Sequence, residues 1–120
     1  MNWTIILVVA AIVIITFMMK QVGQISAQAA LEKLKAGALV IDVRSAGEFS
    51  SSHLAKAINI PLAEIETALP DRVKDKNQVL LLHCQSGMRS GLAQKKLKGM
   101  GYTKAFNLGA YGRAENILKL

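Results

Sequence analysis

The sequence predicts an α/β protein with a mostly parallel sheet, and three observations lead to this fold class. Two strongly apolar runs, 38–43 with Asp42 as its one charged residue and 79–82, have the length and composition of strands that are buried on both faces. Segments with the apolar spacing of helices alternate with such runs along the chain. A polar turn with the only cysteine, Cys84, directly follows the second run. Because ligands of these sheets bind at the carboxyl ends of strands, this turn is the expected functional site.

The first predicted elements of the domain are a brief strand at Ile25 and a helix that starts after Ser26. The Ser26 hydroxyl is suited to accept a hydrogen bond as the N-cap of this helix. Gly37 is suited to end the helix, and the strand 38–43 follows. The apolar stripe of the helix consists of Ala27, Ala30, Leu31 and Leu34. This order of strand, helix and strand is that of a parallel α/β unit.

The middle of the chain predicts a second strand and a second helix. Residues 45–54 are polar and predict a loop with one helical turn. The strand 57–60 follows and is stopped by Pro61, which lacks a backbone N–H. A helix is expected over 62–69, closed by Pro70.

The last third of the chain repeats the same alternation. After the strand 79–82 and the polar turn, a helical pattern runs over 90–100, and Gly101 is suited to end it. A last strand is expected over 103–108, and a final helix over 111–118. All strands therefore follow one another with helical connections, as a parallel sheet requires.

The seven residues from Cys84 to Ser90, Cys-Gln-Ser-Gly-Met-Arg-Ser, join a strand to a helix. In such a turn the backbone N–H groups point inward, above the positive end of the helix dipole. A thiol there is expected to ionise below the free value of about 8.5 and to be nucleophilic near neutral pH. Arg89 can turn inward to bind carbonyl groups or an anion. The sequence therefore predicts a reactive cysteine in an anion-binding turn.

The spacing Cys84-x-x-Gly87-x-Arg89-Ser90 resembles the active-site loop of the rhodanese family of sulfurtransferases. Further segments resemble this family in the same order: Val40-Ile41-Asp42-Val43-Arg44, Glu48-Phe49, His53-Leu54, Ala57-Ile58-Asn59-Ile60-Pro61-Leu62, Gly101-Tyr102 and Asn107-Leu108-Gly109. The similarity covers about Ile25 to Ile117. It implies a rhodanese-like domain with a mostly parallel, five-stranded sheet flanked by helices.

The resemblance also implies a two-step sulfur transfer with Cys84 as the catalytic residue. The Cys84 thiolate would take the outer sulfur of a donor such as thiosulfate, and a thiol or cyanide acceptor would then remove it from the persulfide. The persulfide cradle would be formed by Gln85, Ser86, Gly87, Met88 and Arg89. Supporting roles would fall to Asp42, Arg44 and Ser90. The expected partners are a small sulfur donor and its acceptor, a protein thiol among the candidates, and neither a cofactor nor a metal is expected.

Two other function classes remain open. A membrane-tethered binding or sulfur-carrier module with little turnover would have the same fold, although inert modules of this family commonly lack the cysteine. Phosphatases and arsenate reductases carry a wider loop, Cys-x5-Arg, whereas four residues separate Cys84 from Arg89. The smaller ring of N–H groups favours a persulfide over a tetrahedral oxyanion.

Several residues near the loop have structural interpretations. Asp42 and Arg44 can form an ion pair at the end of their buried strand. His83 precedes the cysteine, but adjacent strand residues point to opposite faces, which disfavours a role as its base. Two departures from the family pattern stand out: Ser52 replaces a common glycine, and 109–112, Gly-Ala-Tyr-Gly, is not followed by the usual tryptophan. The second departure leaves the choice of acceptor open.

An uncharged apolar block, 3–19, precedes the domain. As a helix it would be about 26 Å long, near the short end of what spans a membrane. We therefore predict a transmembrane anchor over 1–20, a linker over 21–24 and the rhodanese-like domain over 25–120.

The charges around this block predict the side of the membrane. Nothing basic precedes it, and the next basic residues are Lys20, Lys33 and Lys35. The positive-inside rule then places a single-pass protein in the bacterial inner membrane with its domain in the cytoplasm. Alternatively, Ala27-Gln28-Ala29 fits a small-x-small cleavage pattern, and cleavage of a signal peptide would release the domain into the periplasm.

The chain is basic, with 15 Lys and Arg, 8 Asp and Glu, and a net charge of +7. The basic residues of the last quarter are Lys95, Lys96, Lys98, Lys104, Arg113 and Lys119. They can form a solvated helix face, attract anionic lipid headgroups or steer an anionic substrate. Nucleic-acid binding is not expected, because no interleaved aromatic residues or known motif accompany the charge.

Overall fold

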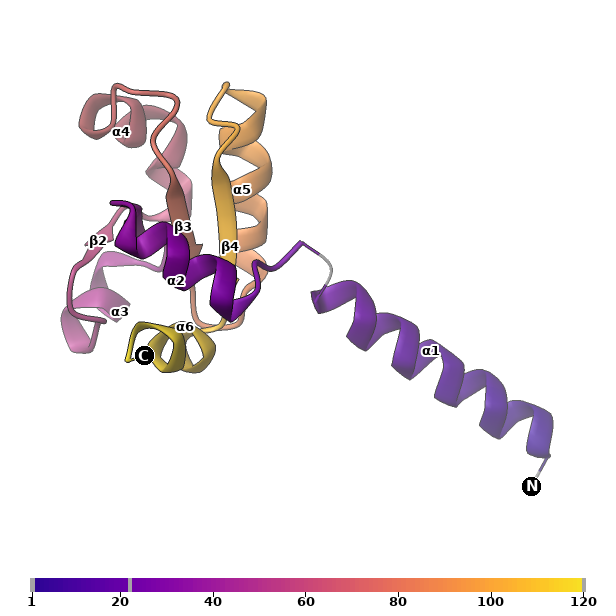
Figure 1. Cartoon of the computed structure of the whole chain (residues 1–120). Helices are drawn as coiled ribbons and strands as arrows, with labels where there is room; N and C mark the ends of the chain where they lie inside the picture. Colours follow the sequence, from indigo (N-terminus) through magenta and orange to yellow (C-terminus); the bar gives the residue numbers. More distant parts are fainter. Residues whose placement is uncertain (1, 22, 120) are drawn as a thin grey trace.

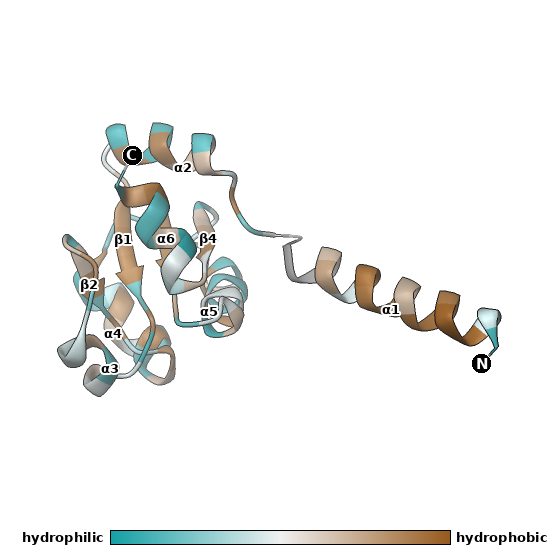
Figure 2. Ribbon diagram, turned by 90° about the horizontal axis from the view of Figure 1, so that it is seen from below, coloured by the Kyte–Doolittle hydropathy of each residue, from teal (hydrophilic) through white to brown (hydrophobic). Residues whose placement is uncertain are grey.

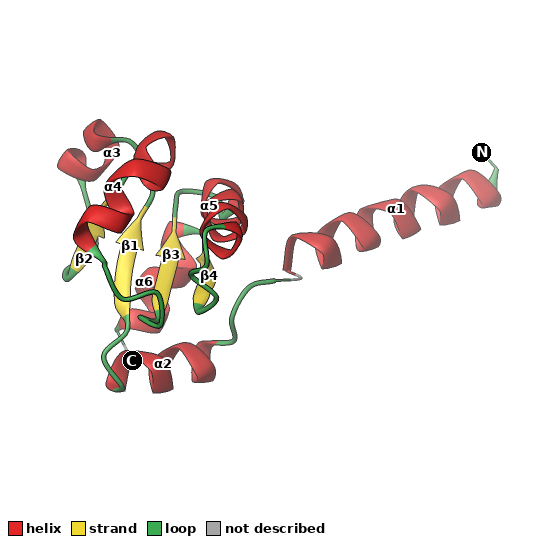
Figure 3. Cartoon of the chain, turned by 90° about the horizontal axis from the view of Figure 1, so that it is seen from above, coloured by secondary structure: helices red, strands yellow, loops and turns green. Residues whose placement is uncertain are grey.

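Four parallel strands form the centre of the structure, a computed structural model that describes residues 2–21 and 23–119. The strands are β1 (Leu39–Asp42), β2 (Ala57–Asn59), β3 (Leu80–His83) and β4 (Ala105–Gly109). Their order across the sheet is β2-β1-β3-β4, and each neighbouring pair is parallel (Figure 3). The prediction of an α/β protein with a parallel sheet is confirmed.

The prediction of a fifth strand at Ile25 is wrong for the described residues. Gln24 forms only an isolated parallel bridge with Asn107, and the Ile25 N–H donates to the Asn107 carbonyl oxygen at 2.9 Å. Ser26 already accepts the N-capping hydrogen bond of the following helix, from the Ala29 N–H at 3.2 Å. The chain therefore turns into a helix after one pairing, and the sheet has four strands.

Helices cover both faces of the sheet (Figures 1 and 3). One face packs against α4 and α5 through side chains such as Ile41, Ile65 and Leu97. The other face packs against α2 and α6 through Val40 and Ile117 among others. The helices of the domain are α2 (Ala27–Lys35), α3 (Ala46–Ser51), the short 3₁₀ helix η1 (Leu62–Glu64), α4 (Ile65–Arg72), α5 (Met88–Gly99) and α6 (Tyr111–Leu118). The side chains of consecutive residues of β1 thus pack on opposite faces of the sheet, as is typical of buried parallel strands.

Pro70 lies inside α4 instead of ending the helix, which corrects the predicted boundary. The ring of Pro70 removes one backbone N–H donor. The Val73 N–H nevertheless donates to the Leu69 carbonyl oxygen at 2.8 Å, so the helical hydrogen bonding continues past the proline. Ile65 and Leu69 are fully buried, and their packing holds the helix against the sheet.

The N-terminal block forms the helix α1 (Trp3–Gln21), which extends away from the domain and is largely apolar (Figures 1 and 2). Within residues 2–21 and 23–119, no helix combines the length and the apolar character that crossing a membrane requires. The prediction of a transmembrane anchor over 1–20 is therefore not supported. A span needs about 20 apolar residues, and the uncharged run 3–19 is shorter. Met1, Val22 of the predicted linker 21–24, and Leu120 lie outside the described residues.

Three of the basic side chains of the last quarter have partners. The Arg113 guanidinium donates to the carbonyl oxygens of Leu108 and Ile25, and so ties α6 to β4 and to the start of α2. Lys96 lies 3.2 Å from Glu66 and Lys119 lies 3.6 Å from Glu115, measured from Nζ to the carboxylate oxygen. Arg113 therefore has a structural role and is not part of a solvated cluster.

Candidate functional site: a buried cysteine between a strand and a helix

Cys84 directly follows β3, and its side chain is fully buried. The Gly87 N–H donates to the Cys84 Sγ at 3.0 Å. The Ser90 hydroxyl lies 3.6 Å from the same sulfur and 3.1 Å from the Gly87 carbonyl oxygen, so it can donate to either. The predicted arrangement, a thiol facing N–H groups at the start of a helix, is present in the structure.

Gly87 has a backbone conformation that requires glycine. Its φ is +94°, and a Cβ at this position would lie 3.3 Å from the Gly109 Cα. The Asn107 side chain amide donates to the Gly87 carbonyl oxygen at 3.2 Å, and Ser86 forms an antiparallel bridge with Ala110. The turn is thus held against the carboxyl end of β4, which places its N–H groups around the sulfur. The sequence alone predicts no role for the Asn107 side chain, which is noted only as part of the segment Asn107-Leu108-Gly109 that resembles the rhodanese family.

The other side chains of the turn point away from the sulfur or lie at its edge. Met88 is 69% exposed, and its backbone N–H donates to the Ser86 hydroxyl at 3.4 Å. The Gln85 amide oxygen lies 3.5 Å from the Arg44 Nη1. Of these three residues, Ser86 acts on the thiolate through its backbone N–H, whereas the Met88 N–H binds the Ser86 hydroxyl and Gln85 links the turn to Arg44.

Two opposing effects set the acidity of Cys84. Burial by itself raises the pKa of a thiol, because the charged thiolate loses hydration. The Ser90 hydroxyl and the backbone N–H groups of Ser90, Gly87 and Ser86 stabilise the thiolate, and the net result is a pKa of Cys84 below its ordinary value. The direction agrees with the prediction from the sequence.

We expect Ser90→Ala to raise the pKa of Cys84, because it removes the side-chain donor and leaves the backbone donors in place. The thiolate fraction at pH 7 would then fall. The rate of Cys84 alkylation by iodoacetamide against pH measures this directly, since the chain has a single cysteine. Ser86→Ala, whose hydroxyl accepts from the Met88 N–H, is the matched control and should move the midpoint much less. An unchanged midpoint in Ser90→Ala would show that the hydroxyl does not bind the thiolate.

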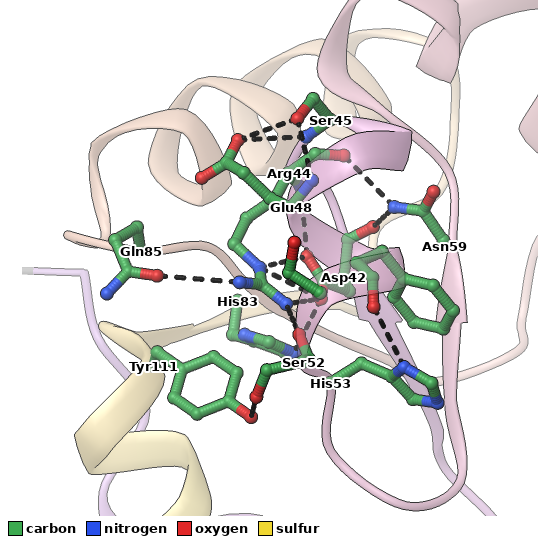
Figure 4. A network of polar contacts seen from close by, with 12 residues as sticks. Asp42, Arg44, Ser45, Glu48, Ser52, His53, Asn59, His83, Gln85 and Tyr111 are labelled. Carbon is green, nitrogen blue, oxygen red and sulfur yellow. Dashed lines mark hydrogen bonds and ion pairs between the residues drawn. The ribbon is translucent and has the colours of Figure 1, made fainter.

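Asp42 and Arg44 form the predicted ion pair, and both are buried (Figure 4). The Asp42 carboxylate accepts hydrogen bonds from the Arg44 backbone N–H at 2.9 Å, Nε at 3.0 Å and Nη2 at 2.8 Å. Arg44 Nη2 also donates to the Ser52 carbonyl oxygen at 2.7 Å, and the guanidinium lies 4.8 Å from the centre of the Tyr111 ring. The pKa of Arg44 is raised, first by its hydrogen bond to Asp42, so the guanidinium carries its charge. This pair joins β1 to the turn after β3 and to α6.

Arg89 does not bind carbonyl groups of the turn; it pairs with Glu48 of α3. Arg89 Nη1 donates to Glu48 Oε1 at 2.7 Å, and Nη2 donates to Oε2 at 3.0 Å. In the sequence, Glu48 belongs to the segment Glu48-Phe49 that resembles the family, and nothing there predicts its partner. The spacing of Ser45 and Glu48 is a capping-box signature that the sequence does show. That signature reveals the start of a helix but not which cation its carboxylate binds.

His83 is fully buried behind the turn. Neither ring nitrogen has a hydrogen-bond partner in the described part of the chain, and Nε2 lies 3.8 Å from Asp42 Oδ2. Burial is the main cause that lowers the pKa of His83, so the ring is neutral near pH 7. The Tyr111 ring packs edge-on against it, with 5.9 Å between the ring centres. His83 is thus part of the packing between β3 and α6.

Ser52 and Tyr111, from the two segments that depart from the family pattern, contact each other. The Ser52 hydroxyl lies 3.2 Å from the Tyr111 hydroxyl, which joins the end of α3 to the start of α6 (Figure 4). Both residues also contact Arg44, through the Ser52 carbonyl oxygen and the Tyr111 ring. The two positions therefore form one structural unit beside the ion pair.

A buried cysteine after a central parallel strand, with its sulfur facing N–H groups at the start of a helix, defines the class of α/β proteins with a cysteine anion site. The sequence model of the rhodanese-like domain matches residues 26–111, and the chain belongs to this family. This confirms the resemblance that was drawn from the cysteine loop.

Relatives of known name support the family. The thiosulfate sulfurtransferase PspE of Escherichia coli is 41% identical over 69 residues, which are 58% of this chain and 66% of the relative. The human thiosulfate:glutathione sulfurtransferase is 33% identical over 87 residues, covering 62% of this chain and 76% of the relative. The structure of the human single-domain sulfurtransferase TSTD1 has a TM-score of 0.66 and 28% identity, and the match covers 82% of this chain and 97% of that one. The chain thus spans slightly less than two thirds of the E. coli relative.

Proposed function

We propose that this protein is a sulfurtransferase that moves sulfane sulfur from a thiosulfate-like donor to a thiol or cyanide acceptor through a persulfide on Cys84. One observation carries the proposal: the Gly87 N–H donates to the Cys84 Sγ at 3.0 Å at the start of α5. Such N–H groups stabilise a thiolate and would equally stabilise the terminal sulfur of a persulfide. The names of the E. coli and human relatives support the same reaction class.

The reaction has two balanced steps. The Cys84 thiolate attacks the outer sulfur of thiosulfate, a new S–S bond forms, and sulfite leaves with the electron pair of the bond that breaks. The persulfide anion then remains on Cys84 beneath the N–H groups of the turn. An acceptor thiolate or cyanide attacks the terminal sulfur, and the Cys84 thiolate is released for the next cycle.

Two measurements on the purified chain test this function. After incubation with thiosulfate and removal of the donor, the intact mass is expected to rise by about 32 Da, one sulfur atom, and reducing agent should reverse the gain. With cyanide present, thiocyanate should accumulate over many turnovers. A mass gain without turnover would identify the alternative, a sulfur-carrier module. Faster hydrolysis of an aryl phosphate than sulfur transfer would contradict the argument from loop length.

We further propose that the domain works in the cytoplasm. The support is chemical: a persulfide on Cys84 can be discharged by thiols, which the cytoplasm keeps reduced. Cell fractionation with N-terminal sequencing of the recovered protein tests this. A mature chain that starts near Ala30 in the periplasm would contradict it.

A further inference from the structure

Arg89 is the only basic side chain in the turn 84–90, and the structure shows that its charge is already paired. Both terminal nitrogens of its guanidinium bind the two carboxylate oxygens of Glu48, at 2.7 and 3.0 Å. Such two-point pairs are among the strongest and most specific hydrogen-bonded contacts of arginine. The side chains are about one third exposed, 36% and 35%, so the pair lies at the surface edge of the site.

The Glu48 carboxylate is positioned by its own helix and not only by Arg89. Its Oε1 accepts hydrogen bonds from the Ser45 N–H at 3.1 Å and from the Ser45 hydroxyl at 3.0 Å, the capping box of α3 (Figure 4). These contacts, with the Arg89 hydrogen bonds first among them, lower the pKa of Glu48 to about 2. The carboxylate is therefore ionised at every pH at which the protein would work.

Arg89 lies in the same turn as Cys84, in the first helical turn of α5. The pKa of Arg89 is raised first by its hydrogen bonds to Glu48 and also by the charges of Cys84 and Asp42. The second guanidinium beside the turn, that of Arg44, is paired with Asp42. Each of these two guanidinium groups thus has its own carboxylate, and a donor that approaches Cys84 meets no unpaired positive charge from these two residues.

We infer that Glu48 determines which sulfur donors the site accepts: by pairing Arg89 it weakens binding of doubly charged donors such as thiosulfate and favours donors with one negative charge or none. The inference rests on the proposed sulfurtransferase function and concerns the donor class of the same site. Glu48 is a positioning residue, because it acts through the Arg89 guanidinium. Alkyl persulfides and thiosulfonates are donors of the favoured class.

The chemical step is the same for both kinds of donor, and comparing the ratio of their rates between variants cancels the differences in size between the donors. Thiosulfate carries two negative charges and leaves as sulfite, whereas benzenethiosulfonate carries one and leaves as benzenesulfinate. In each case the Cys84 thiolate attacks the outer sulfur and the leaving group takes the electron pair. A change that affects only the electrostatics at Arg89 must therefore alter the ratio of the two rates.

The test measures kcat/KM for both donors with cyanide as acceptor. Glu48→Gln keeps the length of the side chain and can still accept from Ser45, but it frees the charge of Arg89. We expect kcat/KM for thiosulfate to rise about fivefold to tenfold relative to benzenethiosulfonate, mainly through KM. The gain should shrink at high salt, where the Debye length falls to a few ångströms. Glu48→Asp keeps the charge and should keep the wild-type preference.

The matched control is Glu66→Gln, which makes the same change in net charge at a glutamate that pairs with Lys96 on α5, away from the turn. A donor ratio in Glu48→Gln that equals the ratio in Glu66→Gln overturns the inference. Glu48→Met, of similar length and without charge, gives the same test if the glutamine variant does not fold.

A second readout separates this inference from the proposed function. Sulfate, a non-reacting dianion, should protect Cys84 from iodoacetamide more strongly in Glu48→Gln than in the wild type. If sulfate protects Glu48→Gln more strongly but neither protein transfers sulfur, the proposed sulfurtransferase function is wrong. The effect of Glu48 on the binding of dianions is then still supported. If both transfer sulfur but protection and donor ratio are unchanged, the role of Glu48 fails and the function stands.

Discussion

Cys84→Ser is expected to reduce thiosulfate-dependent sulfur transfer by at least about 1,000-fold, the largest effect on activity of any single change. A serine hydroxyl stays protonated near neutral pH and cannot hold a sulfur atom as a persulfide. The backbone N–H groups of the turn would remain, but they would have no thiolate to stabilise. The intact-mass gain of about 32 Da should disappear together with thiocyanate formation.

The chain itself supplies a control for this prediction. Because it has a single cysteine, alkylation of the wild-type protein by iodoacetamide must have the same effect as the substitution. Circular dichroism and urea denaturation check that the variant is folded, since serine is close to cysteine in size and Cys84 is buried. A mass gain of one sulfur in folded Cys84→Ser would place the persulfide elsewhere and contradict the proposed function.

Asp42→Ala is expected to cost about 3–5 kcal/mol in the free energy of unfolding, the largest effect on stability. The Asp42 carboxylate has no exposed surface, and Arg44 is only 4% exposed. Removal of the carboxylate leaves a buried guanidinium without its counter-charge, and the remaining contacts to Ser52, Gln85 and Tyr111 do not replace it. Small domains have about 5–15 kcal/mol of stability in total, so the loss would be a large part of it.

Urea denaturation at pH 7 measures this effect, with Glu66→Gln as the surface control. Glu66 pairs with Lys96 at 3.2 Å, but the two side chains are 59% and 45% exposed, and such pairs contribute at most about 1 kcal/mol. If the free energy of unfolding of Asp42→Ala lies within about 1 kcal/mol of the wild-type value, the prediction of a large contribution from the buried Asp42–Arg44 pair is wrong. Activity at low temperature then shows whether loss of the Arg44–Gln85 link also disturbs the turn.

The features that the sequence alone determined are those set by neighbouring residues. The turn from Cys84 to Ser90 is continuous in sequence, so its strand-to-helix geometry could be predicted. The N-cap at Ser26 and the final helix Tyr111–Leu118 were predicted for the same reason. Backbone preferences and side-chain periodicity act over a few residues, so they can be recognised from the sequence alone.

The boundaries that were wrong depended on packing. Ile25 is apolar enough for a strand. Whether the chain goes on pairing with β4 beyond this residue depends on how strongly the helix capped by Ser26 competes with that pairing. Pro70 usually ends a helix, but the buried side chains of Ile65 and Leu69 keep α4 in place around it. In both cases the conformational preference of the local sequence contributes only a small free energy, and tertiary contacts outweigh it.

Only the tertiary structure decided which charges meet at the site. The parallel register of β1 and β3 pairs Asp42 with His83, and so brings the segments after the two strands to the same edge of the sheet. Glu48 and Arg89, 41 residues apart, meet there, as do Arg44 and Gln85. The sequence contained each of these residues and the capping signature of Glu48, but a long-range ion pair follows from the alignment of strands, which no local pattern encodes. The acidity of Cys84 could thus be foreseen from its own turn, whereas the charge that a donor meets depends on a helix from the other half of the domain.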